Sequence, residues 1–433
     1  MRPSQISIVR IICRLNVGGP AIQAILMTEA FRARGYDAML VTGEVAAGES
    51  TMEYLAAAHQ VDTLGIPALA RGISCWKDLL SLGQLIRVLR RQKPAIVHTH
   101  TAKAGALGRL AAIVARTPIR VHTFHGHIFK GYFSPLVTRV FLIIERVLAS
   151  QTDCIIAISE SQRRELTETY RIAPPHKVVV VPLGVDLAPF LKAKSPHGEL
   201  RAALQCQPST PVVGWVGRFT AIKAPELFLH CVPLVTNIFP AARFVMVGGG
   251  ELRAECEQHI AREGLENYVS LLGWRRSLPQ IYADLDLVVC TSISEGTPVA
   301  LLEAMASGKA IVSTDVGGVR DLMIGAPVPF EGMEVFQNGI LVGRDAKLLA
   351  GALRFLLENP EQRQAMGQAG REFVRERFSQ HRLADDLEHL YVSLARSKGL
   401  LPHDPAAGRI ARPASLFASF APSHTKNFEN LPK

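Results

Sequence analysis

The segment from Glu295 to Gly308 reads EGTPVALLEAMASG, and it decides the fold because it follows a strand pattern and contains a run of helix formers. The preceding residues, DLVVC from Asp286 to Cys290, are typical of a buried parallel strand. Pro298 suits a first helical turn, and Val299 to Ala306 favours a helix. The stretch therefore predicts a strand, a loop and a helix whose N-terminus lies at the strand's carboxyl end, where open α/β sheets bind ligands.

Two glutamates of this segment, Glu295 and Glu303, stand about two helical turns apart. The unpaired N–H groups and the positive end of the helix dipole favour an anionic or hydroxyl-rich ligand, and a carboxylate can bind its hydroxyls. The arrangement suits a polyol joined to a phosphate. A helix-capping Glu and a solvated helix Glu would give the same spacing, so the surrounding residues have to decide between the two interpretations.

The longer sequence EGTPVALLEAMASGKAIVSTDVGGVRDL resembles the donor-site signature of the retaining glycosyltransferases of family 4, which have the GT-B fold. The resemblance extends over residues 6–395. It implies an α/β protein with two doubly wound, parallel-sheet, Rossmann-like domains that face a cleft. We expect an N-terminal acceptor-binding domain at 1–190 with a crossing helix at about 380–396, a nucleotide-sugar-binding domain at 191–379, and a disordered tail at 397–433.

Composition agrees with two folded domains. A chain of 433 residues is too long for one ordinary core, and 48% hydrophobic with 20% charged residues is typical of a globular protein. The 7 cysteines are scattered without a CxxC pair, which favours a reducing, cytoplasmic compartment and no structural zinc. The N-terminus lacks a signal-peptide pattern, and charges interrupt the most apolar segment, Tyr132 to Ala149, so we expect no spanning helix.

The net charge of +10 lies mostly in the N-terminal half, where residues 1–190 hold 22 Lys and Arg against 13 Asp and Glu. Lipid head groups and nucleic acid are both candidate partners, and a basic pI without a function is an equal alternative. The apolar segment Tyr132 to Ala149, with basic residues in and beside it, has what a membrane-touching helix needs, although a buried helix explains it as well. We expect peripheral contact with an anionic membrane and no nucleic-acid partner.

Alternating strand and helix patterns fill the N-terminal half and predict a parallel, doubly wound sheet. The first strand, Ile6 to Cys13, leads to Gly18 and Gly19, which permit close backbone approach to a ligand, although a turn explains them equally. His125 and His127 follow a later strand. They suit a metal pair, for which His98 and His100 are conceivable partners, a hydrogen-bond donor to a sugar, or a structural role. The family resemblance implies that His125 contacts the donor sugar.

The C-terminal half predicts a diphosphate site. Residues 187–210, rich in Pro, Lys and Ser, are expected to connect the domains, and Val212 to Val216 forms the next strand. Gly217 permits a bend, and Arg218 and Lys223 can converge across a loop on one diphosphate, where cations stabilise leaving-group charge. A solvated loop has the same spacing. In GRFTAIKAPEL, however, the two cations resemble the family's diphosphate clamp.

The resemblance also implies residues that line the nucleotide. Gly250 belongs to a tight turn whose glycines favour a conformational role, and Trp274 and Arg275 lie where the family lines the base. Asp284 and Asp286 have the spacing of a D-x-D metal motif, but they sit at a helix-to-strand joint, and we expect no metal. The expected donor-binding residues are Gly18, Gly19, Gly217, Arg218, Lys223, Gly250, Trp274, Arg275, Glu295, Gly296, Thr297, Pro298, Val299 and Glu303.

The family implies a retaining hexosyltransferase that moves a sugar from a nucleotide diphosphate sugar to a hydroxyl acceptor without a cofactor. The expected catalytic residues are His125, Arg218, Lys223 and Glu295. A lipid-linked saccharide at the cytoplasmic face of the inner membrane is the expected acceptor, in the synthesis of a cell-surface polysaccharide such as lipopolysaccharide or exopolysaccharide. The alternatives are a nucleotide-sugar epimerase with the same fold and a non-catalytic nucleotide-sugar-binding subunit.

Overall fold

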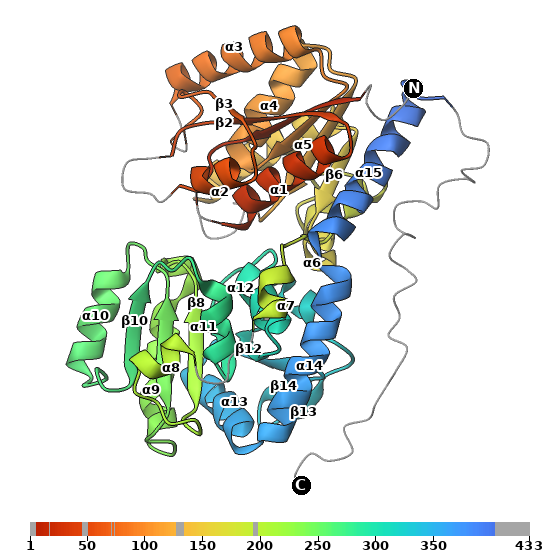
Figure 1. Ribbon diagram of the computed structural model, residues 1–433. Helices are drawn as coiled ribbons and strands as arrows, with labels where there is room; N and C mark the ends of the chain where they lie inside the picture. Colours follow the sequence, from red (N-terminus) through yellow and green to blue (C-terminus); the bar gives the residue numbers. More distant parts are fainter. Residues whose placement is uncertain are drawn as a thin grey trace. The chain divides into compact units, whose positions relative to one another are not determined.

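The computed structural model describes residues 6–16, 18–45, 51–70, 72, 74–126, 134–193 and 198–402. The described chain divides into two compact units (Figure 1). Unit 1 extends to Val185 and resumes at Ser379, and unit 2 runs from Asp186 to Phe378. Both units are α/β, as the sequence predicts. Among the described residues, no helix has both the length and the apolar character that a bilayer-spanning segment needs.

Unit 1 is built on a seven-stranded, all-parallel sheet with the strand order β3-β2-β1-β4-β5-β6-β7. Its central strands are buried on both faces, as is usual in parallel sheets, and they combine Val and Ile with buried polar residues such as Arg10 and His98. The strand order reverses between β1 and β4, which creates a switch point at their carboxyl ends. The strands are β1 (Ser7–Ile12), β2 (Asp37–Thr42), β3 (Thr63–Gly65), β4 (Ile96–His100), β5 (Ile119–Phe124), β6 (Cys154–Ala157) and β7 (Val178–Val180).

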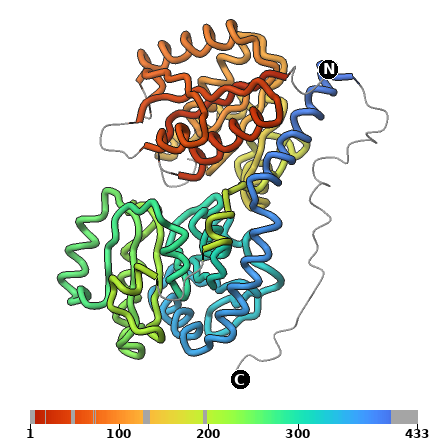
Figure 2. The backbone as a smooth tube through the Cα atoms, viewed as in Figure 1, coloured from red at the N-terminus to blue at the C-terminus, as the bar shows by residue number. Residues whose placement is uncertain are grey.

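Helices cover both faces of this sheet (Figure 2). Ile8 of β1 packs among residues of α1 and α15, whereas the next residue, Val9, packs among residues of α3 and α4 on the opposite face. The helix α5 lies on the same face as α3 and α4 and contacts α4. The helices are α1 (Gly19–Ala33), α2 (Glu53–Ala58), α3 (Cys75–Gln92), α4 (Ala102–Val114), α5 (Pro135–Ser150), α6 (Glu160–Arg164), which continues as a π-helical turn (Glu165–Thr169), and α15 (Gln380–Ser397).

The last helix, α15, completes the core of unit 1. Leu387 and Tyr391 are buried against α1 and the sheet, and Glu388 accepts a hydrogen bond of 2.7 Å from Tyr36. Leu400 and Leu401 pack against the same core. The disordered tail predicted at 397–433 therefore starts too early, because the ordered chain continues past α15; residues 403–433 of that tail lie outside the described residues.

Unit 2 contains an eight-stranded sheet with the order β10-β9-β8-β11-β12-β15-β14-β13. The first six of these strands are parallel, but β14 and β13 are antiparallel to their neighbours, an edge that the purely parallel prediction missed. The switch point lies between β8 and β11. The strands are β8 (Val212–Val216), β9 (Arg243–Val247), β10 (Val269–Gly273), β11 (Leu287–Cys290), β12 (Ala310–Thr314), β13 (Val328–Phe330), β14 (Met333–Phe336) and β15 (Gly339–Val342).

Helices of unit 2 bury one continuous apolar core against this sheet. Pro225 and Pro360 begin α9 and α14, at positions where the missing N–H has no intrahelical partner to lose. The helices are α7 (Ala188–Lys192), α8 (Glu199–Ala203), α9 (Pro225–Thr236), α10 (Arg253–Arg262), α11 (Leu278–Asp284), α12 (Val299–Ala306), α13 (Ala346–Glu358) and α14 (Pro360–Arg377), with 3₁₀ turns at Ala221–Lys223 and Gly317–Leu322.

Residues 187–210 are not the plain linker that their composition predicts. They form α7 and α8, which pack against α11. The carboxylate of Asp284 accepts 3.1 Å hydrogen bonds from the backbone N–H groups of Gly198 and Leu200 at the start of α8. Arg201 of α8 pairs with Asp286 at 2.7 Å. The two aspartates with D-x-D spacing thus anchor this helix, as expected for residues at a structural joint.

Candidate functional site

Two loops meet at the switch point of unit 2, where β8 and β11 end. The first runs from Gly217 to Lys223 and the second from Thr291 to Pro298. The hydroxyl of Thr291 accepts a hydrogen bond from the indole of Trp215 and donates one to the carbonyl of Lys223, both at 2.9 Å. Because Trp215 and Thr291 are buried at the sheet edge, these bonds fix both loops in place before any ligand binds.

An ion pair joins the two loops. The carboxylate of Glu295, 9% exposed, pairs with the ammonium of Lys223, 24% exposed, and accepts a 2.5 Å hydrogen bond from the hydroxyl of Ser292. Burial is the largest influence and lowers the pKa of Lys223, but the charge and hydrogen bond of Glu295, together with Cys290, outweigh it, so the pKa lies above its ordinary value. The lysine is therefore cationic at neutral pH, and it retains exposed surface on which an anion could bind.

Arg218 provides a second cation on the first loop. Its side chain is exposed, and within the described part of the chain no group forms a hydrogen bond or an ion pair with it. Its charge contributes to lowering the pKa of Lys223, which places the two cations within electrostatic reach of each other. The structure thus brings both residues of the predicted diphosphate clamp to one edge of the sheet, one paired and one free.

Glycines allow neighbouring loops to pack directly on this pair of loops. Gly248 has a φ of +131°, and a Cβ there would lie 1.9 Å from the carbonyl oxygen of Gly217. Gly317 has a φ of +51°, and a Cβ there would lie 2.1 Å from the carbonyl oxygen of Glu295. Gly250 is exposed at the same turn as Gly248. These glycines have a conformational role, as the sequence favours.

The helix α12 begins beside Glu295. Its first residue is Val299, and Pro298 occupies the N-cap position rather than the first helical turn that the sequence favours. No side chain caps this end of the helix. Gly296 and Val299 are partly exposed, whereas Thr297 and Pro298 are buried. The helix N-terminus therefore lies next to both charged residues of the ion pair, where an anion would also be stabilised.

Glu303 lies on the second turn of α12 and is partly buried. Its Oε2 accepts a hydrogen bond of 3.0 Å from the hydroxyl of Tyr282. Burial raises the pKa of Glu303 to about 7, although the hydrogen bond from Tyr282 acts in the opposite direction. The carboxyl group is therefore poised to change its charge near neutral pH, which is typical of a functional position. Sequence reasoning identified Glu303 but missed Tyr282, which carries no motif of its own.

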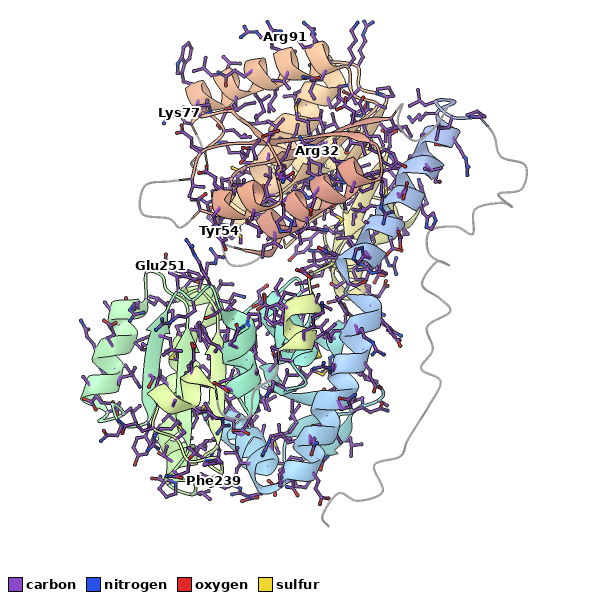
Figure 3. All side chains as sticks on the ribbon, viewed as in Figure 1. Arg32, Tyr54, Lys77, Arg91, Phe239 and Glu251 are labelled. Carbon is purple, nitrogen blue, oxygen red and sulfur yellow. The ribbon has the colours of Figure 1, made fainter. Side chains whose placement is uncertain are left out.

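Trp274 and Arg275 follow β10 and are both exposed. The indole of Trp274 is 48% exposed and lies over the backbone of Gly249, where a Cβ would approach its Nε1 to 2.8 Å. An aromatic face held in this way can stack on a planar ring. The neighbouring turn also carries Glu251, which projects from the surface of unit 2 (Figure 3).

Unit 1 holds its candidate residues at the carboxyl ends of β4 and β5. His125 follows β5, and its Nε2 lies 3.0 Å from Nδ1 of His100 at the end of β4. The other nitrogens, Nδ1 of His125 and Nε2 of His100, are buried and have no hydrogen-bond partner within the described part of the chain. Burial lowers the pKa of His125 to about 3 and that of His100 well below its ordinary value. Both imidazoles are therefore neutral at physiological pH.

Further buried side chains pack against the pair of His100 and His125. The ring of His98 stacks on His100 with centroids 4.3 Å apart, and its Nδ1 lies 2.5 Å from the hydroxyl of Tyr391 on α15. Arg10 is fully buried beside them, with one N–H group 3.2 Å from the same Nδ1 and its guanidinium 5.0 Å from the ring of Phe31. The helix α15 is thus linked through His98 to His100 at the end of β4.

The remaining predicted residues of unit 1 are Gly18 and Gly19. Gly18 precedes α1 and Gly19 is its first residue, at the carboxyl end of β1 next to β4. The predicted partner of His125 in a metal pair, His127, lies outside the described residues. Within the described ranges, no three side chains of His, Cys, Asp or Glu come together as a metal site.

Two doubly wound sheets, each with the same order over its first five strands and with polar residues near its switch point, define an α/β protein of the GT-B class. Solved structures agree. Anabaena HepE in complex with UDP and glucose is similar with a TM-score of 0.75 and 21% identity, over 90% of this chain and 100% of that chain. Sucrose-phosphate synthase from Thermosynechococcus elongatus is similar with a TM-score of 0.74 and 22% identity, over 91% of this chain and 100% of that chain.

Sequence comparisons identify the family. The family described as Glycosyltransferase Family 4 matches residues 17–189, and Glycosyl transferases group 1 matches residues 210–359. The Escherichia coli UDP-Gal:alpha-D-GlcNAc-diphosphoundecaprenol alpha-1,3-galactosyltransferase is 32% identical over 291 residues, which are 66% of this chain and 75% of that protein. The chain belongs to glycosyltransferase family 4. The resemblance carried by the donor-site signature is thereby confirmed.

Two further relatives show how the family varies. The capsular polysaccharide biosynthesis glycosyltransferase CapM of Staphylococcus aureus is 25% identical over 340 residues, covering 76% of this chain and 85% of that protein. The D-inositol 3-phosphate glycosyltransferase of Segniliparus rotundus is 31% identical over 327 residues, covering 71% and 68%. Because the names of these relatives refer to different acceptors and processes, family membership alone does not select a substrate.

Proposed function

We propose that this glycosyltransferase moves a sugar from a nucleotide diphosphate sugar to a hydroxyl of a lipid-linked saccharide, with retention of the anomeric configuration. The observation that carries the proposal is the group formed by Lys223, Glu295 and Arg218 at the switch point of unit 2. It combines one paired cation, one free cation and a held carboxylate. A sugar diphosphate offers partners to all three, since its phosphates are anionic and its hydroxyls donate hydrogen bonds.

The two cations would act on the leaving group. As the bond between the anomeric carbon and the diphosphate breaks, negative charge grows on the phosphate oxygens. Arg218 is free to bind these oxygens, and Lys223 is held within reach by Glu295. A cation that is already held in place, as Lys223 is, stabilises this charge with little reorganisation, and such stabilisation is commonly the largest contribution to catalysis.

The polar groups that remain would position the sugar and the ribose. Glu295 would accept hydrogen bonds from hydroxyls of the donor sugar, and Glu303, on the second turn of α12, from those of the ribose. Trp274 would stack on the base. His125 would supply one neutral hydrogen-bonding atom to the sugar, because its pKa of about 3 keeps it uncharged. Gly18, Gly19 and the N-terminus of α12 would bind phosphate oxygens through backbone N–H groups.

The proposed reaction needs no covalent intermediate with the protein. The acceptor oxygen attacks the anomeric carbon from the face that the diphosphate leaves, so the new bond forms on the side of the broken one. The proton of the acceptor hydroxyl passes to the departing diphosphate oxygen. Cofactors and metal ions have no part in this scheme, because Arg218 and Lys223 provide the positive charge that a metal would otherwise supply.

The proposed acceptor follows from the relatives. The Escherichia coli relative is named for a diphosphoundecaprenol-linked GlcNAc acceptor, and CapM for capsular polysaccharide biosynthesis. A lipid-linked acceptor of this class would place the enzyme at the cytoplasmic face of the membrane, in the assembly of a cell-surface polysaccharide. The basic N-terminal half, with 22 Lys and Arg against 13 Asp and Glu in residues 1–190, agrees with such a location.

A thermal-shift panel of nucleotide diphosphate sugars would test donor binding. We expect one sugar nucleotide to stabilise the wild type and not the double variant Arg218→Ala, Glu295→Ala. The control is Arg375→Ala with Glu376→Ala, two exposed residues of α14 that should leave the shift unchanged. If no sugar nucleotide stabilises the wild type with or without a GlcNAc-diphospholipid acceptor, the donor site is wrong.

Product analysis would test transfer itself. With the stabilising donor and a GlcNAc-diphospholipid, we expect a new glycosidic bond of the same anomeric configuration as the donor. Conversion of the donor sugar to its epimer without any acceptor would instead show a nucleotide-sugar epimerase. Binding without turnover would show a non-catalytic subunit.

A further inference from the structure

The outer face of unit 1 formed by α3, α4 and α5 exposes many large hydrophobic side chains. The chain's exposed large hydrophobic side chains number 17 among the described residues, and 11 of them lie on these three helices. The three helices lie side by side on the same face of the sheet, since α3 packs on α4 and α4 on α5. The 11 exposed side chains therefore lie on one face of the unit, and such grouping of large apolar side chains marks an interaction surface.

The helix α5 contributes most of this surface. Six of its large apolar side chains are exposed, among them Ile143 at 58% and Val147 at 61%. Spacings of three, four and seven residues place them on one side of the helix, opposite the buried Glu145, Leu148 and Ala149. The six side chains are Leu136, Val137, Val140, Ile143, Ile144 and Val147.

The same surface is strongly basic. Residues 75–150 contain 12 Lys and Arg but only 2 Asp and Glu, a net charge of +10 that equals the net charge of the whole chain. Both acids are already neutralised within the unit, since Asp78 pairs with Lys103 at 2.5 Å and the buried Glu145 pairs with Arg109 at 2.7 Å. No acidic side chain of α3, α4 or α5 is exposed.

Exposed cations border the apolar side chains. They lie along α3, beyond α4 and on α5, and Figure 3 shows two of them, Lys77 and Arg91, near the two ends of α3. Trp76, 71% exposed, lies beside Lys77. The exposed basic residues are Lys77, Arg87, Arg90, Arg91, Lys93, Arg116, Arg139 and Arg146.

We propose that the α3–α4–α5 face of unit 1 is a docking surface for an anionic lipid bilayer. The apolar side of α5 inserts into the boundary between head groups and acyl chains, and the cations of α3 and α5 bind the anionic head groups. Trp76 suits the interface, where its ring is apolar and its N–H stays hydrated. A second copy of the chain fits poorly, because pairing would bring together the exposed cations of two faces whose three helices expose no acidic side chain.

This docking surface extends the proposed function. It rests on that function only in one respect, that the membrane carries the lipid-linked acceptor. Its test needs neither donor nor acceptor. The full chain is sedimented with vesicles of phosphatidylglycerol and phosphatidylcholine, or of phosphatidylcholine alone, at low salt and at about 0.5 M salt, where exposed charges are screened. We expect binding to the anionic vesicles at low salt, about tenfold less at high salt, and little binding to phosphatidylcholine.

Matched variants locate the binding surface. Ile143→Asp with Val147→Asp should lower the vesicle-bound fraction about tenfold, because it places two charges in the apolar side. The control is Ile238→Asp in unit 2, where the original side chain is 50% exposed, and it should bind as the wild type does. Arg87→Glu with Arg91→Glu should weaken binding to anionic vesicles, whereas Arg262→Glu with Arg375→Glu in unit 2 should not.

Three results would overturn the proposal. The first is no binding to anionic vesicles at low salt by a protein whose donor-induced thermal shift is intact, which would leave the proposed function standing. The second is equal binding by the wild type and both surface variants. The third is a doubled mass in solution that Ile143→Asp with Val147→Asp abolishes, since this would show that a second copy covers the face. Circular dichroism confirms that each variant is folded.

Discussion

Nε2 of His125 and Nδ1 of His100 lie 3.0 Å apart, so one imidazole must donate the single proton between them and the other must accept it. Burial keeps both rings neutral, so each carries one N–H. The tautomer of His100 therefore determines whether the free Nδ1 of His125 donates or accepts a hydrogen bond. His100 is therefore a positioning residue for the proposed sugar contact. The sequence suggested His100 only as a conceivable metal partner of His125. Its positioning role was not predicted, because the pairing of β4 with β5 is what brings it beside His125.

Replacing His100 should affect turnover more than donor binding. We expect His100→Ala to lower kcat about tenfold, the effect of one lost hydrogen bond, with little change in KM for the donor. His100→Asn can still place a polar atom near the position of Nδ1 and should recover part of the rate. The control is His122→Ala, which removes a buried histidine bonded to Thr99 rather than to His125. An unchanged kcat in His100→Ala would refute the role.

Glu303 should make donor binding depend on pH. Its pKa is about 7 in the folded protein, and the ionised carboxylate is the better acceptor for ribose hydroxyls. We expect the affinity for the donor to fall about tenfold from pH 8 to pH 6, as the carboxylate becomes protonated. Glu303→Gln should bind more weakly at pH 8 and lose this dependence. Isothermal titration calorimetry at several pH values measures the donor affinity. The same pH profile in the wild type and Glu303→Gln would contradict the prediction.

The same group should influence stability in the opposite direction. Its pKa is raised from 4.5 to about 7 in the folded state, so the fold favours the protonated form. The resulting stabilisation is complete below pH about 4.5 and is lost as the pH rises through about 7. We expect Glu303→Gln to match the wild type in thermal unfolding at pH 5 and to unfold a few degrees higher at pH 8. A lower midpoint at pH 8 would contradict the expectation.

Lys223 and Glu295 should depend on each other for stability. Lys223→Met leaves the nearly buried Glu295 without its cation, and we expect the free energy of unfolding to fall by about 2–4 kcal/mol. Adding Glu295→Gln should recover about half of this loss, since the uncompensated charge is gone. Transfer activity should remain low in the double variant. Denaturant unfolding measures the cycle, and strictly additive losses would argue against a functional ion pair.

Arg218 should behave differently because it has no partner in the described chain. We expect Arg218→Ala to change the free energy of unfolding by about 0.5 kcal/mol or less, as surface substitutions do. Its kcat should nevertheless fall about 100-fold through the loss of a leaving-group cation. Arg218→Lys keeps the charge but not the planar guanidinium, and its kcat should lie between those of the wild type and Arg218→Ala. A large loss of stability without loss of activity would reverse this interpretation.

Asp284 should be a structural residue despite its D-x-D spacing. It accepts two backbone hydrogen bonds at the start of α8, so Asp284→Ala should destabilise unit 2 by about 1–3 kcal/mol. The donor-induced thermal shift should persist in this variant, and transfer by the wild type should persist in EDTA. Loss of transfer in EDTA that Mg²⁺ restores would overturn the expectation of a metal-independent reaction.

Local patterns explain which parts of this fold could be predicted. The strand Val212–Val216 was predicted to the residue, and the helix Val299–Ala306 was predicted except that Pro298 caps it rather than lying in its first turn. Both could be predicted because their residue patterns and their Gly and Pro boundaries are local. The antiparallel strands β13 and β14 were missed because runs of three or four residues carry no clear period. The helix α8 was missed because its support, Asp284, comes from a distant part of the chain.

The site residues likewise divide into those with a local motif, which could be predicted, and those without one, which could not. Arg218, Lys223 and Glu295 occur in contiguous motifs, so their approach at one sheet edge could be expected from sequence. Tyr282 and His100 have no motif, since their importance arises only from what they touch in the folded chain. The exposure of the apolar side of α5 was likewise undecided, because an apolar helix face looks the same in sequence whether a core or a solvent boundary lies beside it.

The return of α15 to unit 1 has a consequence for how the protein is made. Leu387 and Tyr391 complete the core of the first unit, yet the ribosome adds them only after all of unit 2 has been synthesised. Unit 2 is continuous and can fold as it leaves the ribosome, whereas unit 1 must wait with an apolar face of α1 and the sheet uncovered. The half of the protein that is made first therefore matures last, and during this interval we expect its uncovered apolar face to be accessible to chaperones.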